Sequence, residues 1–266
     1  MQLRIEHRTT YTYEEPVKYT AQTLRLTPRR EGAQRVLSWD IRTPGRRTEQ
    51  LDAHGNTTQL LTLEQPHRSI EIAVRGVVEI TGEEGFVPFD GTLSPLAYLA
   101  PTPLTSANAQ MTSLARERLA GEQPLRERLY RLAAGVNESV RYTPGTTSVE
   151  DSAVQAFARG EGVCQDQAHV FIACCRAAGI PARYVSGYLC SIDGPDSASH
   201  AWVDAWLETA QGWLSIDITH LKPMGEHHCR LAVGRDYLDA APVRGVRRGG
   251  GQEVLDVRVV ASSDGQ

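Results

Sequence analysis

The sequence predicts an α+β protein in which an antiparallel β domain precedes a core that mixes helices and strands. Three observations support this prediction. Apolar and polar residues alternate along roughly the first 80 residues, as in half-buried strands. A stretch rich in proline and glycine follows, and beyond it apolar residues recur every three or four positions, as in helices. We therefore expect an N-terminal antiparallel β-sandwich domain over residues 1–85, a proline-rich linker over 86–105 and a second domain over 106–266.

Three runs carry the alternation of the first domain: Leu3 to Tyr13, Leu37 to Ile41 and Ile70 to Ile80. Residues 52–56 supply turn-forming side chains between two such runs. Short alternating strands joined by tight turns are typical of antiparallel sandwiches and barrels. The linker is predicted because four prolines, which donate no backbone hydrogen bond, fall between residues 88 and 103.

In the second domain, apolar spacing predicts helices over 108–119, over 124–140 and from Cys164 to Gly179. Gly179 and the proline that follows it end the last of these helices. The segments predicted to follow it as strands are 182–189, 200–208 and 212–218, and the last two are joined as a hairpin. A final strand over 254–260 could join either sheet.

Composition limits the possible partners and the compartment. The net charge is −4, with 28 Lys and Arg against 32 Asp and Glu, so no basic excess is present to neutralise nucleic-acid phosphates. No apolar run approaches the roughly 20 residues of a membrane helix, and the N-terminus resembles a strand rather than a signal peptide. The five cysteines are odd in number and lie in the C-terminal half, unlike a disulfide framework. We expect a reduced, cytoplasmic protein that binds neither nucleic acid nor membrane; its oligomeric state stays open.

Cys164, His200 and Asp217 are the residues through which the sequence predicts chemistry. A thiol, an imidazole and a carboxylate are the parts of a nucleophile, base and orienting relay. Cys164 begins a predicted helix, where unpaired amides and the helix dipole favour a thiolate, and its own N–H is a candidate oxyanion donor. His200 and Asp217 lie on adjacent predicted strands, but simple hairpin counting places Asp217 opposite Asp204. A bulge or a longer turn is needed to bring Asp217 to His200.

Three sequence blocks carry a resemblance to a known family: GVCQDQAHVFIACCRAAGIPARYVSGYL, SHAWVDAWL and GWLSIDITH. In residues, order and spacing they resemble the transglutaminase-like superfamily, above all its bacterial branch with an N-terminal β domain, and the resemblance covers the whole chain. It implies a papain-like core in which a helical part packs on an antiparallel sheet, with no metal and no organic cofactor. Position by position, Cys164 matches the nucleophile of the family, His200 its base and Asp217 its orienting carboxylate.

The chain departs from the family pattern after Asp217. The family reads Asp-Pro-Thr-Asn where this sequence reads Asp-Ile-Thr-His, so the turn loses its proline and His220 adds a titratable group near the site. Related enzymes often carry a tyrosine or tryptophan before the thiol. Tyr142 is therefore our candidate for polarising the oxyanion.

His220, His227, His228 and Cys229 form a short cluster of metal-ligand residue types. Adjacent histidines do not easily present both rings to one tetrahedral ion, and no C-x-x-C motif accompanies them. We therefore expect no metal site.

The sequence leaves three functions open. The first is a thiol-dependent amide hydrolase, a cysteine protease or peptidase that acts on protein or peptide substrates through a thioester acyl-enzyme. The second is a transglutaminase, in which an amine releases the same thioester. The third is an inactive scaffold whose β domain binds a partner protein. The natural substrate cannot be read from one sequence.

Overall fold

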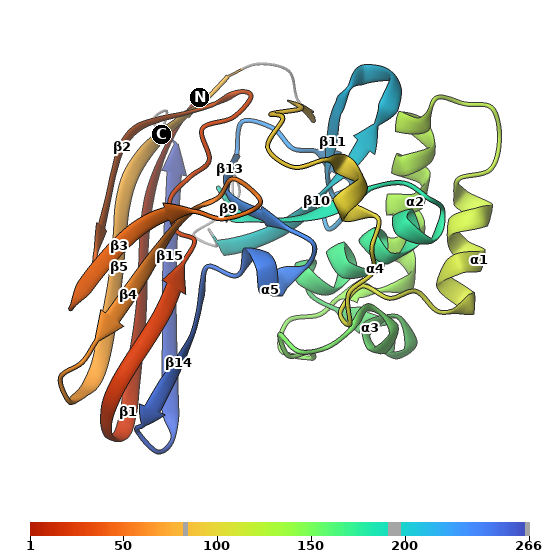
Figure 1. Ribbon diagram of the computed structural model, residues 1–266. Helices are drawn as coiled ribbons and strands as arrows, with labels where there is room; N and C mark the ends of the chain where they lie inside the picture. The colour runs from red at the N-terminus through yellow and green to blue at the C-terminus, as the bar shows by residue number, and fades with distance from the viewer. Residues whose placement is uncertain (82–84, 191–197, 264–266) are drawn as a thin grey trace.

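The computed structural model describes residues 1–81, 85–190 and 198–263. The fold of the described residues is α+β, as predicted. A β domain lies beside a core in which helices pack on a second sheet (Figure 1). The helices are α1 (Ala109–Arg118), α2 (Leu125–Ser139), α3 (Ala153–Arg159), α4 (Cys164–Ala177) and α5 (Tyr237–Ala240), with 3-10 turns η1 (Pro95–Tyr98) and η2 (Glu208–Ala210). The strands are β1 (Gln2–Leu24), β2 (Gln34–Arg42), β3 (Arg46–Leu51), β4 (Thr57–Leu63), β5 (His67–Ile80), β6 (Phe86–Pro88), β7 (Arg141–Tyr142), β8 (Glu161–Gly162), β9 (Ala182–Leu189), β10 (Ala198–Leu207), β11 (Gly212–Asp217), β12 (Lys222–Pro223), β13 (His228–Gly234), β14 (Val243–Gly249) and β15 (Glu253–Ser263).

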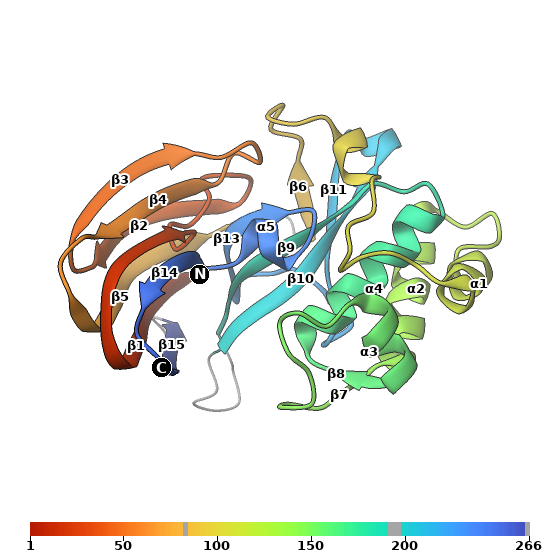
Figure 2. The same cartoon turned by 60° about the horizontal axis from the view of Figure 1, so that its bottom comes forward.

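The long strand β1 organises the N-terminal domain, because its two parts have different neighbours. Its first part pairs with β5 and β15, and its last part pairs with β4 and β14. This gives the strand orders β2-β5-β1-β15 and β3-β4-β1-β14. Inward side chains of both sets share one hydrophobic cluster. Figure 2 shows these strands curving beside the core.

The C-terminal strands complete the N-terminal domain. The sequence analysis did not decide which sheet the final strand joins. In the structure this strand, β15, pairs with β1 along Leu3 to Tyr13. The β14–β15 turn follows the bend of β1, and its glycines 249–251 all have positive φ angles. The N-terminal domain predicted over 1–85 therefore lacks two of the strands found here, because backbone pairing over this distance has no local sequence signal.

The predicted linker is also part of the core. Residues 86–88 form β6, which pairs with β11, and Tyr98 is buried against Trp213. Along β2, a bulge between Val36 and Ser38 breaks the predicted alternation, so Leu37 is exposed although the pattern placed it inward.

The core sheet has the order β12-β11-β10-β9-β13, and α4 packs against β9 and β10. Nearly all of α4 is buried, because the other helices cover it: α1, α2 and α3 all contact it. The apolar run from Val170 to Cys175 is typical of a central helix. This burial fixes the position of the helix N-terminus against the sheet.

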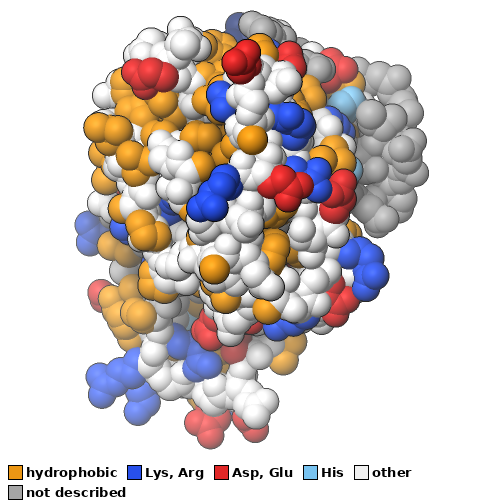
Figure 3. Space-filling view, turned by 90° about the vertical axis from the view of Figure 1, so that its right-hand side faces the viewer, with side chains coloured by type: hydrophobic (Ala, Val, Ile, Leu, Met, Phe, Trp, Pro, Cys, Tyr) orange, Lys and Arg blue, Asp and Glu red, His pale blue; other side chains and the backbone are white. Residues whose placement is uncertain are grey.

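The face of the helical core mixes charges of both signs, and histidine side chains reach the surface at one margin of it (Figure 3). None of the helices in the described part of the chain is long and apolar enough to cross a membrane. All five cysteines are free thiols.

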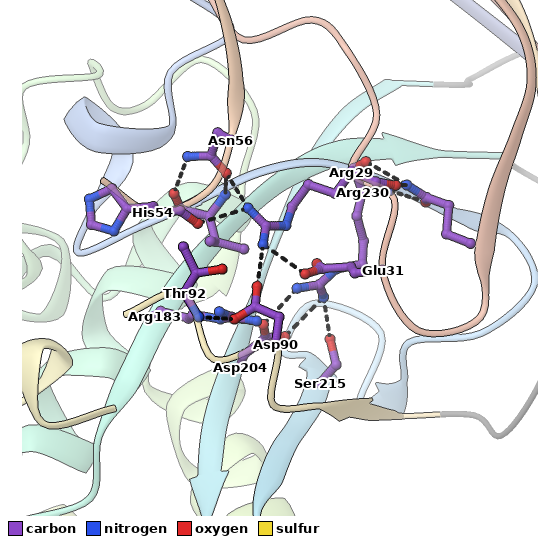
Figure 4. Close-up of polar contacts among 12 residues, drawn as sticks. Arg29, Glu31, His54, Asn56, Asp90, Thr92, Arg183, Asp204, Ser215 and Arg230 are labelled. Atoms are coloured by element: carbon purple, nitrogen blue, oxygen red, sulfur yellow. Dashed lines mark hydrogen bonds and ion pairs between the residues drawn. The ribbon is translucent and has the colours of Figure 1, made fainter. Parts of the chain in front are cut away.

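A buried ionic network joins the two domains (Figure 4). Arg230 of β13 donates two hydrogen bonds to Asp204 of β10, at 3.0 and 2.7 Å, and a third to Glu31 at 2.9 Å. Arg183 binds the same aspartate at 2.8 Å. Arg29 in turn pairs with Glu31 at 2.8 Å. Breaking a buried pair of this kind typically costs several kcal/mol, so the network fixes the β domain against the sheet that carries the site.

Candidate active site

Cys164 stands at the first position of α4 and is partly exposed. The helix start is held by Asp166, whose Oδ2 accepts hydrogen bonds from the Val163 amide at 2.8 Å and the Thr147 hydroxyl at 2.7 Å. Amides of the first helical turn lack intrahelical partners, so they surround the thiol with positive potential. The position therefore stabilises an anion that forms beside the start of α4.

His200 connects the thiol to a carboxylate. Its Nε2 lies 2.9 Å from Oδ2 of Asp217, and Cys164 lies close enough to raise the pKa of the ring. Burial acts to lower the pKa of His200, but the hydrogen bonds to Asp217 and Cys164 outweigh it and raise the pKa to about 10. The imidazole is therefore held as an imidazolium between two acidic groups at neutral pH. The structure thus brings together the three residues selected from the sequence.

The hairpin register explains how Asp217 reaches His200. Sequence counting placed Asp217 opposite Asp204, but Asp204 pairs with Ser215 because the turn includes the extra residues of η2. Asp217 lies one position beyond the last pair, Val203 with Ile216. Its side chain is then a diagonal neighbour of His200 on one face of the sheet. The counted register was wrong by two residues, and the longer turn removes the mismatch.

Asp217 is fully buried and accepts hydrogen bonds from three histidines. Oδ2 lies 2.9 Å from Nε2 of His200, 2.8 Å from Nδ1 of His220 and 3.1 Å from Nε2 of His228, and Oδ1 accepts the His220 amide at 3.1 Å. Burial acts to raise the pKa of Asp217, yet the three imidazole hydrogen bonds keep it well below its usual range. An ionised carboxylate only accepts, so each imidazole nitrogen that faces it carries a proton.

The tautomer of His228 is fixed by its other nitrogen. The Gly225 amide donates to Nδ1 of His228 at 3.2 Å, so Nδ1 carries no proton and Nε2–H donates to Asp217. Burial lowers the pKa of His228 more strongly than Asp217 raises it. His228 is thus a neutral donor, in contrast to the charged His200. The sequence analysis did not predict that His228 donates to Asp217, because no local spacing pattern indicates this contact.

Two tyrosines lie near the thiol. Tyr142, the predicted oxyanion residue, sits on β7 beside Gly162 of β8 and is about half exposed. Its pKa is raised by burial and then by the charge of Cys164. Tyr184 of β9 is fully buried, and the same two causes raise its pKa well above the usual range. Tyr184 was not selected from the sequence, where it looks like an ordinary strand residue.

The metal-ligand residue types that cluster in the sequence do not form one site in the structure. His220 and His228 point to Asp217, whereas Cys229 belongs to the hydrophobic cluster of the β domain. Donor atoms of His200, Asp217 and His228 do lie within 4.8 Å of one another, which suits a metal ion by residue type. Ligation through Nε2 of His228 would move the proton to Nδ1, where the Gly225 amide already donates. The residues therefore fit a hydrogen-bonded carboxylate better than a metal centre.

Comparison with known proteins gives two family matches. Residues 112–218 match the Transglutaminase-like superfamily, and residues 3–79 match the Bacterial transglutaminase-like N-terminal region. The chain is 33% identical over 280 residues to "Uncharacterized protein ML0607" of Mycobacterium leprae, with 97% of each chain covered. It is 32% identical over 142 residues to the protein-glutamine gamma-glutamyltransferase of Pseudomonas aeruginosa, which covers 48% of this chain and 21% of that protein.

Among solved structures, the one named "a Putative Cysteine Protease from Cytophaga hutchinsonii" aligns with a TM-score of 0.80 and 23% identity. The alignment covers 100% of this chain and 91% of that one, so the two share the whole fold. Because both domains match family models and a relative is similar along nearly its full length, the chain belongs to the transglutaminase-like superfamily and carries its bacterial N-terminal region.

Proposed function

We propose that the protein is a thiol-dependent amide hydrolase, a cysteine protease or peptidase that uses Cys164, His200 and Asp217 through a thioester. The observation that carries this proposal is the position of His200, 2.9 Å from Asp217 and close enough to Cys164 for the thiol to raise the pKa of the ring. Membership of the superfamily and the fold shared with a structure named as a cysteine protease support the same class.

The proposed reaction has two halves. The Cys164 thiolate attacks the carbonyl carbon of a protein or peptide amide, forming a C–S bond, and the C–N bond breaks as the His200 imidazolium gives its proton to the departing amine. Water then attacks the thioester while His200 takes a proton from it, and the C–S bond breaks to release the acid. Asp217 holds the imidazole in place and balances its charge. The steps need only these side chains and water.

The oxyanion of each tetrahedral intermediate would form at the start of α4. The amide of Cys164, at the first helical position, has no intrahelical acceptor, so its N–H can donate to the oxyanion. Tyr142 is the candidate side-chain donor because it is exposed enough to meet a substrate. Losing a single oxyanion donor commonly lowers turnover by about 100-fold or more.

Amine transfer is the second candidate function. It shares the thioester half and differs only in the acceptor, an amine in place of water. The match to the Pseudomonas protein-glutamine gamma-glutamyltransferase favours it, although that match covers about half of this chain. Incubation of the protein with glutamine-containing peptides and a fluorescent primary amine would separate the two. Faster amine incorporation than hydrolysis would replace the hydrolase assignment by the transferase one.

Thiol reactivity tests the relay without a known substrate. We expect iodoacetamide at pH 7 to label Cys164 at least about tenfold faster in the wild type than in His200→Ala, because a free thiol is only a few per cent thiolate at this pH. Mass spectrometry of the digested protein would give the labelling rate at each cysteine. Cys174 is an internal reference, since burial raises its pKa to about 12.

His227→Ala is a matched control, because this neighbouring histidine contacts only Glu226 at 3.8 Å among the charged groups of the described residues. It should label Cys164 at the wild-type rate. Equal labelling of Cys164 in the wild type and His200→Ala would remove the relay and leave the inactive scaffold as the better reading.

A further inference from the structure

β15 is an edge strand with unusual exposure. Within the described residues it pairs as a strand with β1 alone, so the backbone of Val254 to Val260 has no second strand beside it, whereas Ala261 accepts a hydrogen bond from Cys190. Four of its apolar side chains are exposed: Val254 by 68%, Leu255 by 52%, Val257 by 49% and Val260 by 57%. The edge strand β3, in contrast, is mostly charged and polar. Exposed apolar edges are where β proteins associate.

Both faces of β15 contribute to this surface. Leu255, Val257 and Val259 lie opposite β1 residues that point into the domain, so they share its inner face. Val254, Asp256, Arg258 and Val260 alternate with them on the outer face. Figure 2 shows β15 at the margin of the domain, next to the chain end. Among the described residues, the inner face is therefore left open at Leu255 and Val257, whereas Val259 and Ala261 pack in the hydrophobic cluster of the domain.

Backbone geometry restricts how a second β15 can pair with the first. Alternate residues point their N–H and C=O groups to the same edge, so in a two-fold antiparallel pair each residue faces one of its own parity. Placing the axis at Val257 puts Asp256 opposite Arg258 of the second copy, and Arg258 opposite Asp256. A shift of one step in either direction places Asp256 against Asp256, or Arg258 against Arg258. Charge therefore selects the register centred on Val257.

We propose that the protein forms a two-fold dimer through β15, with this register. Inner-face residues then meet inner-face residues, Leu255 opposite Val259 and Val257 opposite itself, while Val254 meets Val260 on the outer face. The two β domains share one continuous sheet, and the open inner edge is covered by its copy. Within one chain Arg258 lies 3.1 Å from Asp256, so pairing extends an existing ion pair into a cluster of four alternating charges. The inference does not rest on the proposed enzyme activity.

Charge swaps test the register. Light scattering after gel filtration of the full chain should find a dimer for the wild type. Asp256→Arg and Arg258→Asp each place like charges opposite one another twice, and each should raise the dissociation constant by about tenfold or more. The double variant Asp256→Arg/Arg258→Asp restores opposite charges and should dimerise like the wild type. That recovery would exclude simple misfolding of the single variants.

Asp40→Arg is the matched control. Asp40 and Arg42 form the same type of exposed ion pair, two residues apart at 2.8 Å, on the edge strand β2. This variant should leave the dimer intact. A wild-type chain that is monomeric at all concentrations would overturn the proposal, and so would a dimer unaffected by Asp256→Arg.

Discussion

At the scale of single residues, the distribution of protons around Asp217 Oδ2 is the decisive feature of the site. Three imidazoles donate to this one oxygen, and the pKa of His200 is raised whereas that of His228 is lowered. His228 stays neutral because of burial and because the Gly225 amide occupies Nδ1. A second buried cation next to His200 would repel the charge that the relay needs. His228 can therefore hold the Asp217 carboxylate in place without adding a second positive charge next to His200.

We predict that His228→Leu lowers the catalytic efficiency, or the labelling rate of Cys164, by about tenfold or more, the worth of a hydrogen bond to a charged group. With one donor fewer, Asp217 binds the His200 imidazolium more tightly. The pKa of His200 should rise further, and the basic limb of the pH profile should move to higher pH.

His228→Gln tests the origin of this effect, because its amide can still donate to Asp217. It should recover part of the loss. A purely structural role for His228 would instead lower the melting temperature of both variants and leave the pH profile unchanged.

At the scale of elements, the close packing of β9 and β10 supports the histidine. His200 pairs with Gly187 across these strands, and Trp202 stacks on the His200 ring at a centroid distance of 6.1 Å. A Cβ atom at Gly187 would come within 2.4 Å of the Trp202 ring and 2.2 Å of the Cys229 carbonyl oxygen. The missing side chain at Gly187 thus leaves room for the tryptophan beneath the site.

Gly187→Ala should displace Trp202, reduce the labelling rate of Cys164 and destabilise the fold by about 1–3 kcal/mol through overpacking. Thermal unfolding and iodoacetamide labelling would measure the two effects. Gly135→Ala in α2 is the contrasting variant, because only flexible side chains approach there. It should label normally and keep or gain stability. Normal labelling in Gly187→Ala would show that the ring stacking does not position His200.

At the scale of the whole molecule, a buried histidine lies at the contact between the two domains. His7 of β1 lies 2.6 Å from the Tyr188 hydroxyl of β9 and 2.7 Å from the Thr9 hydroxyl. Burial lowers its pKa from 6.5 to about 4. Between these two values the unfolded chain binds a proton that the folded chain excludes, so stability falls as pH decreases through this window.

His7→Gln keeps polar contacts but cannot titrate. Relative to this variant, the wild type should lose about 2–3 kcal/mol of stability between pH 7 and pH 4.5. Urea unfolding at both pH values would measure the difference. Thr9→Val, which removes a hydrogen bond but keeps the histidine, should stay as acid-sensitive as the wild type. Parallel losses in the wild type and His7→Gln would assign the acid sensitivity to other groups.

Local sequence patterns were sufficient for the fold class, for α4 with Cys164 at its start, and for the order of β9, β10 and β11. Periodicity and helix-end signals depend on neighbouring residues, so they can be read directly from the chain. The resemblance to the superfamily came from the same short blocks, and the family matches confirm it.

Only the tertiary structure decided the pairing of β15 with β1, the turn that aligns Asp217 with His200, and the convergence of His220 and His228 on one carboxylate oxygen. These features join residues far apart in the chain, and backbone pairing and buried hydrogen bonds leave no periodic trace in sequence. The sequence thus determined which side chains are available, from Cys164 to Asp217. Packing determined how His200 and His228 share protons with Asp217, because the balance between burial and hydrogen bonding sets the charge of each.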